Sequence, residues 1–302
     1  MALLANHATT VAVIFGALFL LWLDVVGYVQ CVSAVRVKFG MPKALVFSAV
    51  LRVNFMPAWP IATESMTLAT LDTSEMFVME PQTSKPTSAK GFLFIPGALV
   101  HPHAYAPILG SLANVSGAVC VCIKPRFRHP GIWTADEQHA LDVMQKFPRV
   151  QTWVISGHSL GAGGFGAARV VSRLLARDSP MGGTRADKAR VGGLVMWAGV
   201  VTKGAEVDLS KASGLQTLVI LASEDSVVPP DGKAEDGSRI RDNLKAFHAP
   251  KTKVVVIKGA NHGGFGHYGP QRFPRPDKPR TISLEDQQSQ VIEHTARFLR
   301  GL

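Results

Sequence analysis

Apolar residues follow two different patterns along the chain. Up to residue 63 they form long, almost uncharged runs, among them Ala8–Leu23 and Val25–Val35. Beyond Glu64, short apolar runs alternate with turn residues and with longer amphipathic stretches. Short buried-type strands that alternate with helices are typical of a mostly parallel sheet with helices on both faces. The sequence therefore predicts a hydrophobic segment over residues 1–35, a linker or membrane-surface segment over residues 36–63, and an α/β domain over residues 64–302.

The α/β part predicts a hairpin followed by alternating strands and helices. The hairpin covers Met66–Leu71 and Glu75–Met79. Strands are predicted at Gly91–Ile95, Ala118–Ile123, Gln151–Ser156, Val191–Trp197, Thr217–Ala222 and Lys253–Lys258. Helices are predicted at Thr134–Phe147 (with Thr134 as N-cap), Leu160–Ala176 and Ser283–Leu299. Fewer than 20 residues separate Gly199 from Thr217, which leaves no space for a separate lid domain.

The N-terminal apolar segment is long enough for a transmembrane helix. About 20 residues cross a hydrocarbon core of about 30 Å, and only Asp24 interrupts the uncharged stretch from Ala8 to Val35. Positive residues follow this stretch and none precedes it, which places the rest of the chain on the cytoplasmic side. We therefore expect a retained, single-pass membrane anchor. The alternative is a secreted protein whose signal peptide is cleaved near Ala34, although a signal peptide begins with positive charge.

A G-x-S-x-G pentapeptide, Gly157-His158-Ser159-Leu160-Gly161, stands between a predicted strand and a predicted helix. Its glycines suit a turn so tight that side chains would collide with neighbouring strands. Such a turn leaves the serine hydroxyl exposed at its apex, in strained backbone geometry. This context favours a nucleophile at Ser159 over a serine in an ordinary turn.

A nucleophilic serine needs a histidine base and a carboxylate that orients the base. In this topology they follow in the order serine, acid, histidine, each at the carboxyl end of a strand. The strand ending at Ala222 runs into Ser223-Glu224-Asp225, and the strand ending at Lys258 runs into Gly259-Ala260-Asn261-His262. We therefore predict a catalytic triad of Ser159, Asp225 and His262.

Other residues compete for two of these roles. Glu224 is the rival acid, but Asp225 stands three residues before Val228-Pro229, where this turn usually carries its carboxylate. The rival bases follow no late strand so directly; they are His101, His103 and His267.

An acyl-transfer site also needs two backbone N–H groups that stabilise the oxyanion of the tetrahedral intermediate. One is predicted at Leu160, directly after the nucleophile. The other is predicted in Pro96-Gly97-Ala98-Leu99, the turn after the strand Gly91–Ile95, with Ala98 as the donor.

Taken together, these motifs resemble the α/β-hydrolase superfamily, and within it the small dienelactone-hydrolase-like branch called alpha/beta hydrolase fold-5. The resemblance covers about residues 90 to 300. It rests on Phe94–Ala98 with His103–Pro107, on Gly157–Gly161, and on the tail Asn261–Gln271 with Thr281–Ser283 and Asp286–Gln288. It implies the hydrolase fold and the same triad, and it names no substrate. Ala98 and Ala162 stand where that family often has glycine.

Composition and charge restrict the cofactors and partners. With 47% hydrophobic and 18% charged residues the chain is not disordered, and a net charge of +10 favours anionic surfaces. We expect no nucleic acid, because no recognition motif accompanies the charge. The basic loop residues Arg272–Arg280 are a candidate contact with lipid headgroups. No metal or organic cofactor is expected: Cys120 and Cys122 lack a second ligand pair, and the G-x-G-x-x-G match at Gly161–Gly166 falls within the serine turn.

The sequence therefore predicts a membrane-anchored serine hydrolase with an α/β-hydrolase fold. Its substrate would be a small-molecule or lipid carboxylic ester, cleaved through an acyl-enzyme intermediate on Ser159. Two alternatives remain. One is an acyltransferase or thioesterase with the same triad, and the other is a catalytically silent hydrolase-fold protein that binds a ligand or partner at the membrane.

Overall fold

The computed structural model describes residues 56, 58–82, 89–125, 128, 130, 137–176, 191–201, 207–230, 244–271 and 276–302. All of these lie in the compact unit Met56–Leu302. The predicted membrane anchor, the linker as far as Phe55, the N-cap Thr134 and the basic residues Arg272 and Arg275 lie outside the described residues. Within the described ranges, no helix has the length and hydrophobicity to cross a membrane.

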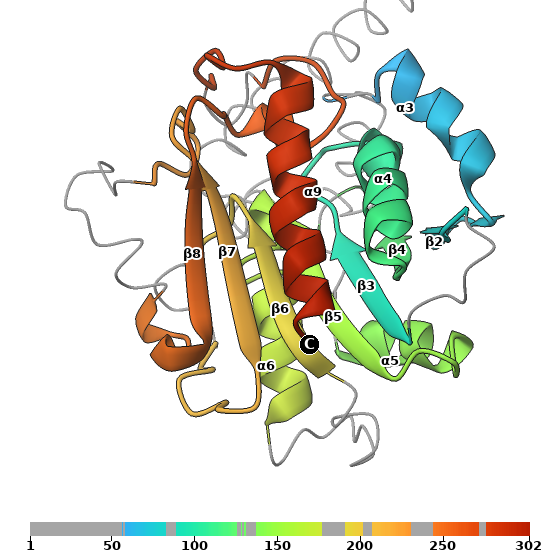
Figure 1. The fold of residues 1–302 in the computed structure, drawn as a ribbon, viewed down its shortest axis with the longest axis vertical. Helices are drawn as coiled ribbons and strands as arrows, with labels where there is room; N and C mark the ends of the chain where they lie inside the picture. Colours follow the sequence, from blue (N-terminus) through green and yellow to red (C-terminus); the bar gives the residue numbers. More distant parts are fainter. Residues whose placement is uncertain are drawn as a thin grey trace, which may run out of the picture. The chain divides into compact units, whose positions relative to one another are not determined.

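Eight strands of the described residues form one sheet, in the order β1-β2-β4-β3-β5-β6-β7-β8 (Figure 1). In chain order the strands are β1 Leu71–Asp72, β2 Met76–Met79, β3 Lys90–Ile95, β4 Val119–Ile123, β5 Thr152–His158, β6 Val191–Trp197, β7 Gln216–Ala222 and β8 Thr252–Ile257. Strand β2 pairs antiparallel with β1 and β4, and every other neighbouring pair is parallel. The predicted, mostly parallel α/β sheet is confirmed.

Helices cover both faces of this sheet (Figure 1). On one face α4 (Ala106–Ser116) packs against α9 (Leu284–Arg300), and on the other α5 (Glu137–Lys146) packs against α6 (Ala167–Leu175). Side chains of a strand point alternately to the two faces. In β3, Phe92 and Phe94 therefore join the core under α4 and α9, whereas Leu93 and Ile95 join the core under α5 and α6. This double burial explains why the strand sequences are continuously apolar.

The first arm of the predicted hairpin is wrong over most of its length. Instead of a strand over Met66–Leu71, the chain forms α3 (Pro60–Glu64), which continues as the 3-10 helix Ser65–Leu68, and only Leu71–Asp72 pairs with β2. Pro60 suits the first turn of a helix because its missing N–H needs no partner there. The hydroxyl of Thr67 then donates to the carbonyl of Glu64, which keeps the helical path.

The helix predicted over Leu160–Ala176 begins later than expected. The chain first makes a short 3-10 turn, Ser159–Gly161, and α6 starts only at Ala167. Glycine is a poor helix former, and Gly163 passes so close to another loop that a Cβ atom there would lie 2.0 Å from the carbonyl oxygen of Val200. Gly163 therefore permits the close approach of this turn to the loop after β6.

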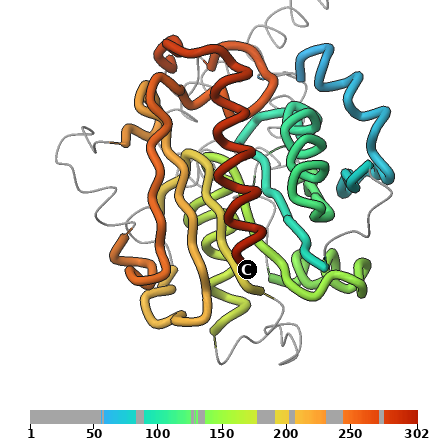
Figure 2. The backbone as a smooth tube through the Cα atoms, in the orientation of Figure 1, coloured from blue at the N-terminus to red at the C-terminus, as the bar shows by residue number. Residues whose placement is uncertain are grey.

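The parallel strands all end at the same edge of the sheet, and their following loops gather there. Figure 2 shows the chain after β8 crossing this edge, at the top of the view, before it returns as α9 beside the sheet. The segment that begins at Met56 reaches the same loops, because Met56 pairs with Val100 and Ala58 pairs with Tyr268. Residues within the predicted linker 36–63 thus contact the α/β domain.

Candidate active site

Ser159 lies directly after β5, in the turn that the G-x-S-x-G pattern predicts. Its backbone φ angle is +55°, in the left-handed region that a side chain rarely adopts. A Cβ atom on Gly157 would lie 2.1 Å from the carbonyl oxygen of Gly161, and one on Gly161 would lie 2.2 Å from that of Pro96. The two glycines therefore permit a turn that no other residue type would fit, and the turn holds the serine in strained geometry.

Asp225 and His262 come from the loops after β7 and β8, and they meet in a hydrogen bond. The Nδ1 atom of His262 lies 2.7 Å from Oδ2 of Asp225, and both side chains are almost completely buried. The other carboxylate oxygen of Asp225 accepts the backbone N–H groups of Val227 and Val228 at 2.8 and 2.6 Å. Asp225 is thus held in place by the backbone of its own turn. Nε2 of His262, the other ring nitrogen, is buried without a hydrogen-bond partner in the described part of the chain.

The serine turn and the imidazole of His262 lie side by side. His158, the residue before Ser159, has its ring centroid 4.7 Å from that of His262. Burial holds the pKa of His158 well below its usual value, and the neighbouring His262 lowers it further, so the His158 ring is neutral. The structure therefore places Asp225 and His262 beside the turn that carries Ser159, at the carboxyl edge of the sheet; among the described residues no hydrogen bond joins Ser159 to Nε2 of His262.

The rival residues take other partners. The side chain of Glu224 accepts a hydrogen bond from the hydroxyl of Ser223, its neighbour. Nε2 of His267 lies 2.7 Å from the side-chain oxygen of Gln288 in α9. His101 accepts the backbone N–H of His103, and His103 lies 3.7 Å from a carboxylate oxygen of Asp72. The described contacts of these side chains therefore lie away from the Asp225–His262 pair.

Helix α9 supports the loop that carries His262, a contribution that the sequence analysis missed. Gln287, which is completely buried, accepts the backbone N–H of Asn261 at 3.1 Å and donates to the carbonyl of the same residue at 2.8 Å. The side chain of Asn261 in turn accepts the N–H of Gly264. A Gln-Gln pair on the buried face of an amphipathic helix was the available signal, and it belongs to the tail on which the family resemblance rests.

A buried hydroxyl joins the serine turn to the loop after β3. The oxygen of Tyr105 lies 2.8 Å from Nδ1 of His158 and accepts the backbone N–H of Gly97 at 3.1 Å. Burial raises the pKa of Tyr105 far above its ordinary value, so the phenol keeps its proton. Because the phenol has no other acceptor for its proton among the described residues, we assign its O–H as the donor to Nδ1 of the neutral His158.

Among the described residues, neither of the two predicted oxyanion donors has an acceptor for its backbone N–H group. Gly97 donates to Tyr105, and Leu99, at a φ angle of +62°, donates to the carbonyl of Arg128 at 2.6 Å. Ala98 between them has no hydrogen-bond acceptor among the described residues. Leu160 occupies the first turn of the 3-10 helix Ser159–Gly161, where a backbone N–H has no intrahelical acceptor.

Metal ligands do not gather in the part of the chain that is described: no group of three or more His, Cys, Asp or Glu side chains there could hold an ion. Cys120 and Cys122 are free and completely buried in β4, and burial raises the pKa of both thiols. They serve as small core side chains.

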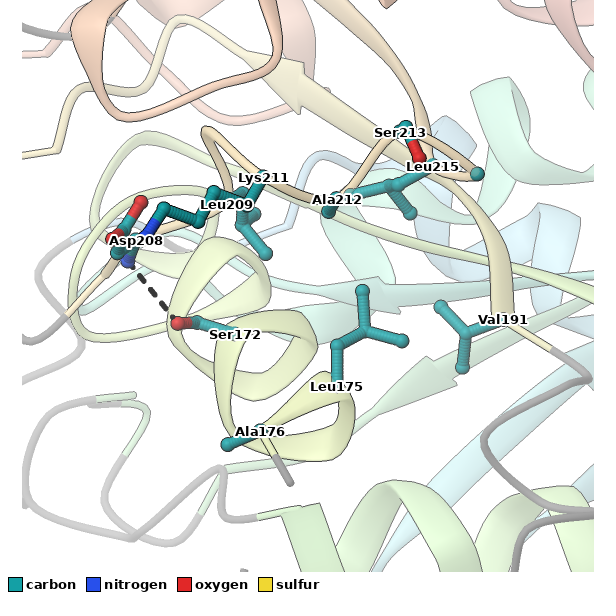
Figure 3. A pocket seen from close by; sticks show the side chains of 11 residues that line it. Ser172, Leu175, Ala176, Val191, Asp208, Leu209, Lys211, Ala212, Ser213 and Leu215 are labelled. Atoms are coloured by element: carbon teal, nitrogen blue, oxygen red, sulfur yellow. Dashed lines mark hydrogen bonds between the residues drawn. The ribbon is translucent and has the colours of Figure 1, made fainter. Parts of the chain in front are cut away.

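A large open cavity lies away from these residues. It has a volume of about 1010 Å³ and lies between the end of α6 and the loop before β7 (Figure 3). Its lining includes Val191, the first residue of β6, and Leu215, which precedes β7, so it opens at the amino edge of the sheet. In Figure 3 the hydroxyl of Ser172 accepts the N–H of Asp208 across this cavity. Ser159 and His262 lie at the opposite, carboxyl edge.

Comparison with known proteins agrees with this architecture. The model of the alpha/beta hydrolase family matches residues 91–289, which span the strands β3–β8, the serine turn and the start of α9. The chain belongs to the alpha/beta hydrolase family. No curated protein matches it in sequence.

Among solved structures, this alpha/beta hydrolase is similar to esterase 2 of the planctomycete Thermogutta terrifontis. The tabun-phosphoramylated form and the propionate-bound form each share 16% identity with the chain, with TM-scores of 0.52. The butyrate-bound form shares 15% identity, with a TM-score of 0.51. Each alignment covers 78% of this chain and 95% of the esterase. At this identity the likeness shows a shared fold.

Proposed function

We propose that the protein is a serine hydrolase that cleaves carboxylic esters, with Ser159 as nucleophile, His262 as base and Asp225 as the group that orients it. The observation that carries the proposal is the buried Asp225–His262 hydrogen bond beside the strained serine turn. Nδ1 of His262 is engaged by the carboxylate, so Nε2 is the atom left to accept a proton. An apolar side chain would fill the same buried space at a lower cost than this histidine, so packing alone does not account for it.

In the proposed reaction, Oγ of Ser159 attacks the ester carbonyl carbon while its proton passes to Nε2 of His262. The N–H groups of Leu160 and Ala98 stabilise the negative charge on the former carbonyl oxygen. The C–O bond to the alcohol then breaks, and the alcohol leaves with the proton from His262. Water repeats the sequence on the acyl-enzyme: it gives a proton to His262, attacks the acyl carbon, and releases the acid and the free serine.

The structural neighbours support an ester substrate with a short acyl part. The esterase with the similar fold is described as binding propionate and butyrate and as being phosphoramylated by tabun. An organophosphorus reagent is therefore a suitable probe of the hydrolase proposed here. Fewer than 20 residues join β6 to β7, so no lid domain stands there to select long chains.

The decisive experiment labels the full-length protein with a fluorophosphonate probe, beside Ser159→Ala and Ser213→Ala. Ser213 is an exposed serine at the amino edge of the sheet, so its variant controls for labelling of serines in general. We expect labelling of the parent and of Ser213→Ala, and none of Ser159→Ala. A folded parent that takes no label would support the silent hydrolase-fold alternative, and label on Ser159→Ala would assign the nucleophile elsewhere.

A labelled parent leads to a substrate series. Esters and matched thioesters of rising acyl length, each with water or an added alcohol as acceptor, separate an esterase from a thioesterase and an acyltransferase. We expect kcat/KM to be highest for oxygen esters of short acids with water as acceptor. A preference for thioesters, or acyl transfer that outcompetes hydrolysis, would replace the esterase assignment while keeping the triad.

We also propose that the hydrophobic stretch 8–35, in which Asp24 is the one charged residue, anchors the protein in a membrane, with the hydrolase domain on the cytoplasmic side. The support is the length of the stretch and the positive residues that follow it. We expect the full chain to remain in the membrane pellet after alkaline carbonate, and Leu18→Arg/Leu20→Arg to be released. Val115→Arg, on the exposed surface of α4, adds charge outside the stretch and should stay in the pellet. A mature chain that begins near Val35 by mass spectrometry would instead show signal-peptide cleavage.

A further inference from the structure

A second carboxylate stands beside the Asp225–His262 pair. Asp277 lies in the segment between Gln271 and α9, and its side chain reaches the loops after both β7 and β8. One oxygen, Oδ2, accepts the backbone N–H of Gly263 at 2.9 Å, and the other, Oδ1, accepts the N–H of Ser226 at 3.2 Å. Gly263 follows His262 and Ser226 follows Asp225. The Asp277 side chain therefore accepts hydrogen bonds from the residue after the base and from the residue after the acid.

The segment that carries Asp277 is itself fixed to the acid loop. The hydroxyl of Ser226 donates to the carbonyl of Pro276 at 2.9 Å and accepts the N–H of Lys278 at 3.0 Å. The N–H of Asp277 donates to the carbonyl of Gln271 at 2.9 Å. The Asp277 carboxylate is therefore fixed in position. Its two hydrogen bonds join the loop after β7, which carries Asp225, to the loop after β8, which carries His262.

The two loops also meet before the triad residues, closer to their strands. There the N–H of Glu224 donates to the carbonyl of Ala260 at 2.8 Å. The Asp225–His262 hydrogen bond is thus enclosed between this backbone contact on one side and the Asp277 carboxylate on the other. Removing the Asp277 contacts would take away the acceptor that the residue after the acid and the residue after the base share.

The carboxylate also adds negative charge to the surroundings of the imidazole. The titratable groups around His262 are Asp225 from the β7 loop, Asp277, Tyr268 from the loop after β8, and His158 from β5. Burial raises the pKa of Tyr268 and lowers that of His158, so both are neutral. Burial raises the pKa of Asp277 above its ordinary value and the charge of Asp225 adds to that rise, while the two backbone N–H groups and the nearby His262 offset part of it. Within the described ranges, Asp225 and Asp277 are thus the two groups able to face a protonated imidazole with negative charge.

We infer that Asp277 is a positioning residue of the active site: it holds the loops of Asp225 and His262 at the spacing their hydrogen bond needs, and it adds a second negative charge beside the imidazolium formed during the reaction. It touches no substrate atom and acts through His262. The inference rests on the proposed function, since it assigns a task to the same site.

Three variants of the full-length protein separate the positioning effect of Asp277 from the effect of its charge. Asp277→Asn keeps the size of the side chain, removes the charge and leaves one N–H without an acceptor. Ser226→Ala loosens the segment that carries Asp277 and keeps the charge. Glu224→Gln removes a carboxylate from the same loop, on a side chain that bonds to Ser223 and not to the residues after the acid or the base.

We expect kcat/KM of Asp277→Asn for a chromogenic ester to fall about tenfold, mainly through kcat, with KM within about twofold of the parent. The acid limb of its pH–rate profile should move to lower pH, because a protonated imidazole is less favoured once the second negative charge is gone. Ser226→Ala should lose less activity without moving that limb, and Glu224→Gln should match the parent.

A spectroscopic readout keeps the inference testable without turnover. The Nδ1 proton of His262, hydrogen-bonded to Asp225, gives a downfield signal in the proton NMR spectrum, which we expect to persist in Glu224→Gln and to be lost or exchange-broadened in Asp277→Asn. If the parent hydrolyses no ester and takes no fluorophosphonate, the proposed function fails, and this signal still decides the role of Asp277. Parental kcat/KM, pH profile and signal in Asp277→Asn would overturn the inference. A lower Tm with those three unchanged would overturn it too, since it would show a purely structural contribution.

Discussion

Replacing Tyr105 by phenylalanine removes one oxygen atom from the core and leaves two buried polar groups without a partner. The Tyr105 side chain is completely buried, and its hydroxyl is the acceptor for the N–H of Gly97 and the donor to Nδ1 of His158. No water can replace the oxygen unless the ring moves. The substitution therefore affects the loop after β3 and the serine turn together.

The magnitude follows from the number of orphaned groups. A buried donor or acceptor left unsatisfied costs about 1–3 kcal/mol, and Tyr105→Phe creates two. Phenylalanine recovers part of this because no hydroxyl is then removed from water on folding. We expect the free energy of unfolding to fall by about 2–4 kcal/mol, against less than about 1 kcal/mol for an ordinary buried Tyr→Phe exchange with one weak bond.

Tyr268 offers that matched comparison within the same cluster. Its hydroxyl is also buried, but it makes a single long contact of 3.4 Å with the side-chain oxygen of Gln271. Equilibrium unfolding of the full-length parent, Tyr105→Phe and Tyr268→Phe in urea gives the two differences directly. Losses of the same size in both variants would refute the reasoning, because they would show that the Gly97 and His158 contacts contribute nothing beyond ordinary burial.

The activity of Tyr105→Phe provides a second test of the same contacts. The N–H of Ala98 follows Gly97 in the turn that Tyr105 holds, and an oxyanion donor acts mainly in the transition state. We expect kcat of Tyr105→Phe on a short-chain ester to fall about tenfold with KM little changed, whereas Tyr268→Phe stays within about twofold of the parent.

Three further predictions concern the acid, the serine turn and the stability in acid. Asp225→Asn should lower kcat about 10⁴-fold by fixing the wrong imidazole tautomer, while Glu224→Gln keeps parental activity, as initial rates on one ester will show. Gly161→Ala should destabilise the fold by about 3 kcal/mol in urea unfolding, because its Cβ would lie 2.2 Å from a carbonyl oxygen of the neighbouring loop. Burial, and then the charge of Arg128, lower the pKa of His101 to about 4, so the unfolded chain takes up the proton first as the pH falls below about 6.5. Between pH 7 and pH 5 the free energy of unfolding of the parent should therefore fall by about 1 kcal/mol more than that of His101→Asn, after halving for the partial exposure of the ring. Equal losses in both proteins would contradict the assignment.

The strands and the order of the chemical groups could be predicted because each leaves a local signal. Strand β6 has the predicted bounds, Val191–Trp197, and the other parallel strands begin or end within one or two residues of prediction. A continuously apolar run bounded by glycine or proline identifies such a strand, and the chemistry follows at its carboxyl end. Ser159, Asp225 and His262 could be selected on that basis alone, without knowledge of how the loops pack.

Helix α4 shows why a local signal can be present and still be missed. The segment Ala106–Ser116 buries one face against the sheet and α9, but its exposed face carries no charged residue, so it lacks the charged face that usually marks an amphipathic helix. Its two ends do carry signals: Pro107 lies in the first turn, and Gly117 closes the helix at a φ angle of +74°. End signals without a charged face did not distinguish the segment from an irregular connection.

The partners of the residues that support the site could not be predicted from the sequence, for a different reason. Asp277 lies 15 residues from His262 and 52 from Asp225, and Gln287 lies 26 residues from Asn261. Nothing in the local sequence of either residue specifies a partner, because the contacts exist only once the segment after β8 has folded back over the sheet. Their roles depend on the tertiary path of one loop, which no periodicity encodes.

Backbone strain ties these supports to the predicted chemistry. Four non-glycine residues of the described chain have positive φ angles, and three of them, Leu99, Ser159 and Ala198, lie in the loops that leave β3, β5 and β6 at the carboxyl edge. A non-glycine residue with a positive φ angle costs about 1–2 kcal/mol. The strain stored at the carboxyl edge of the sheet is therefore comparable with a large part of the free energy of unfolding of a domain. Contacts that over-determine the geometry must offset it. Leu99 donates to the carbonyl of Arg128 and Ala198 to that of Ile220, while the serine turn is held through His158 and the buried hydroxyl of Tyr105. Weakening Tyr105 should therefore release strain in Ser159 as well as break two hydrogen bonds, which is why its effect on kcat is expected to exceed its effect on KM.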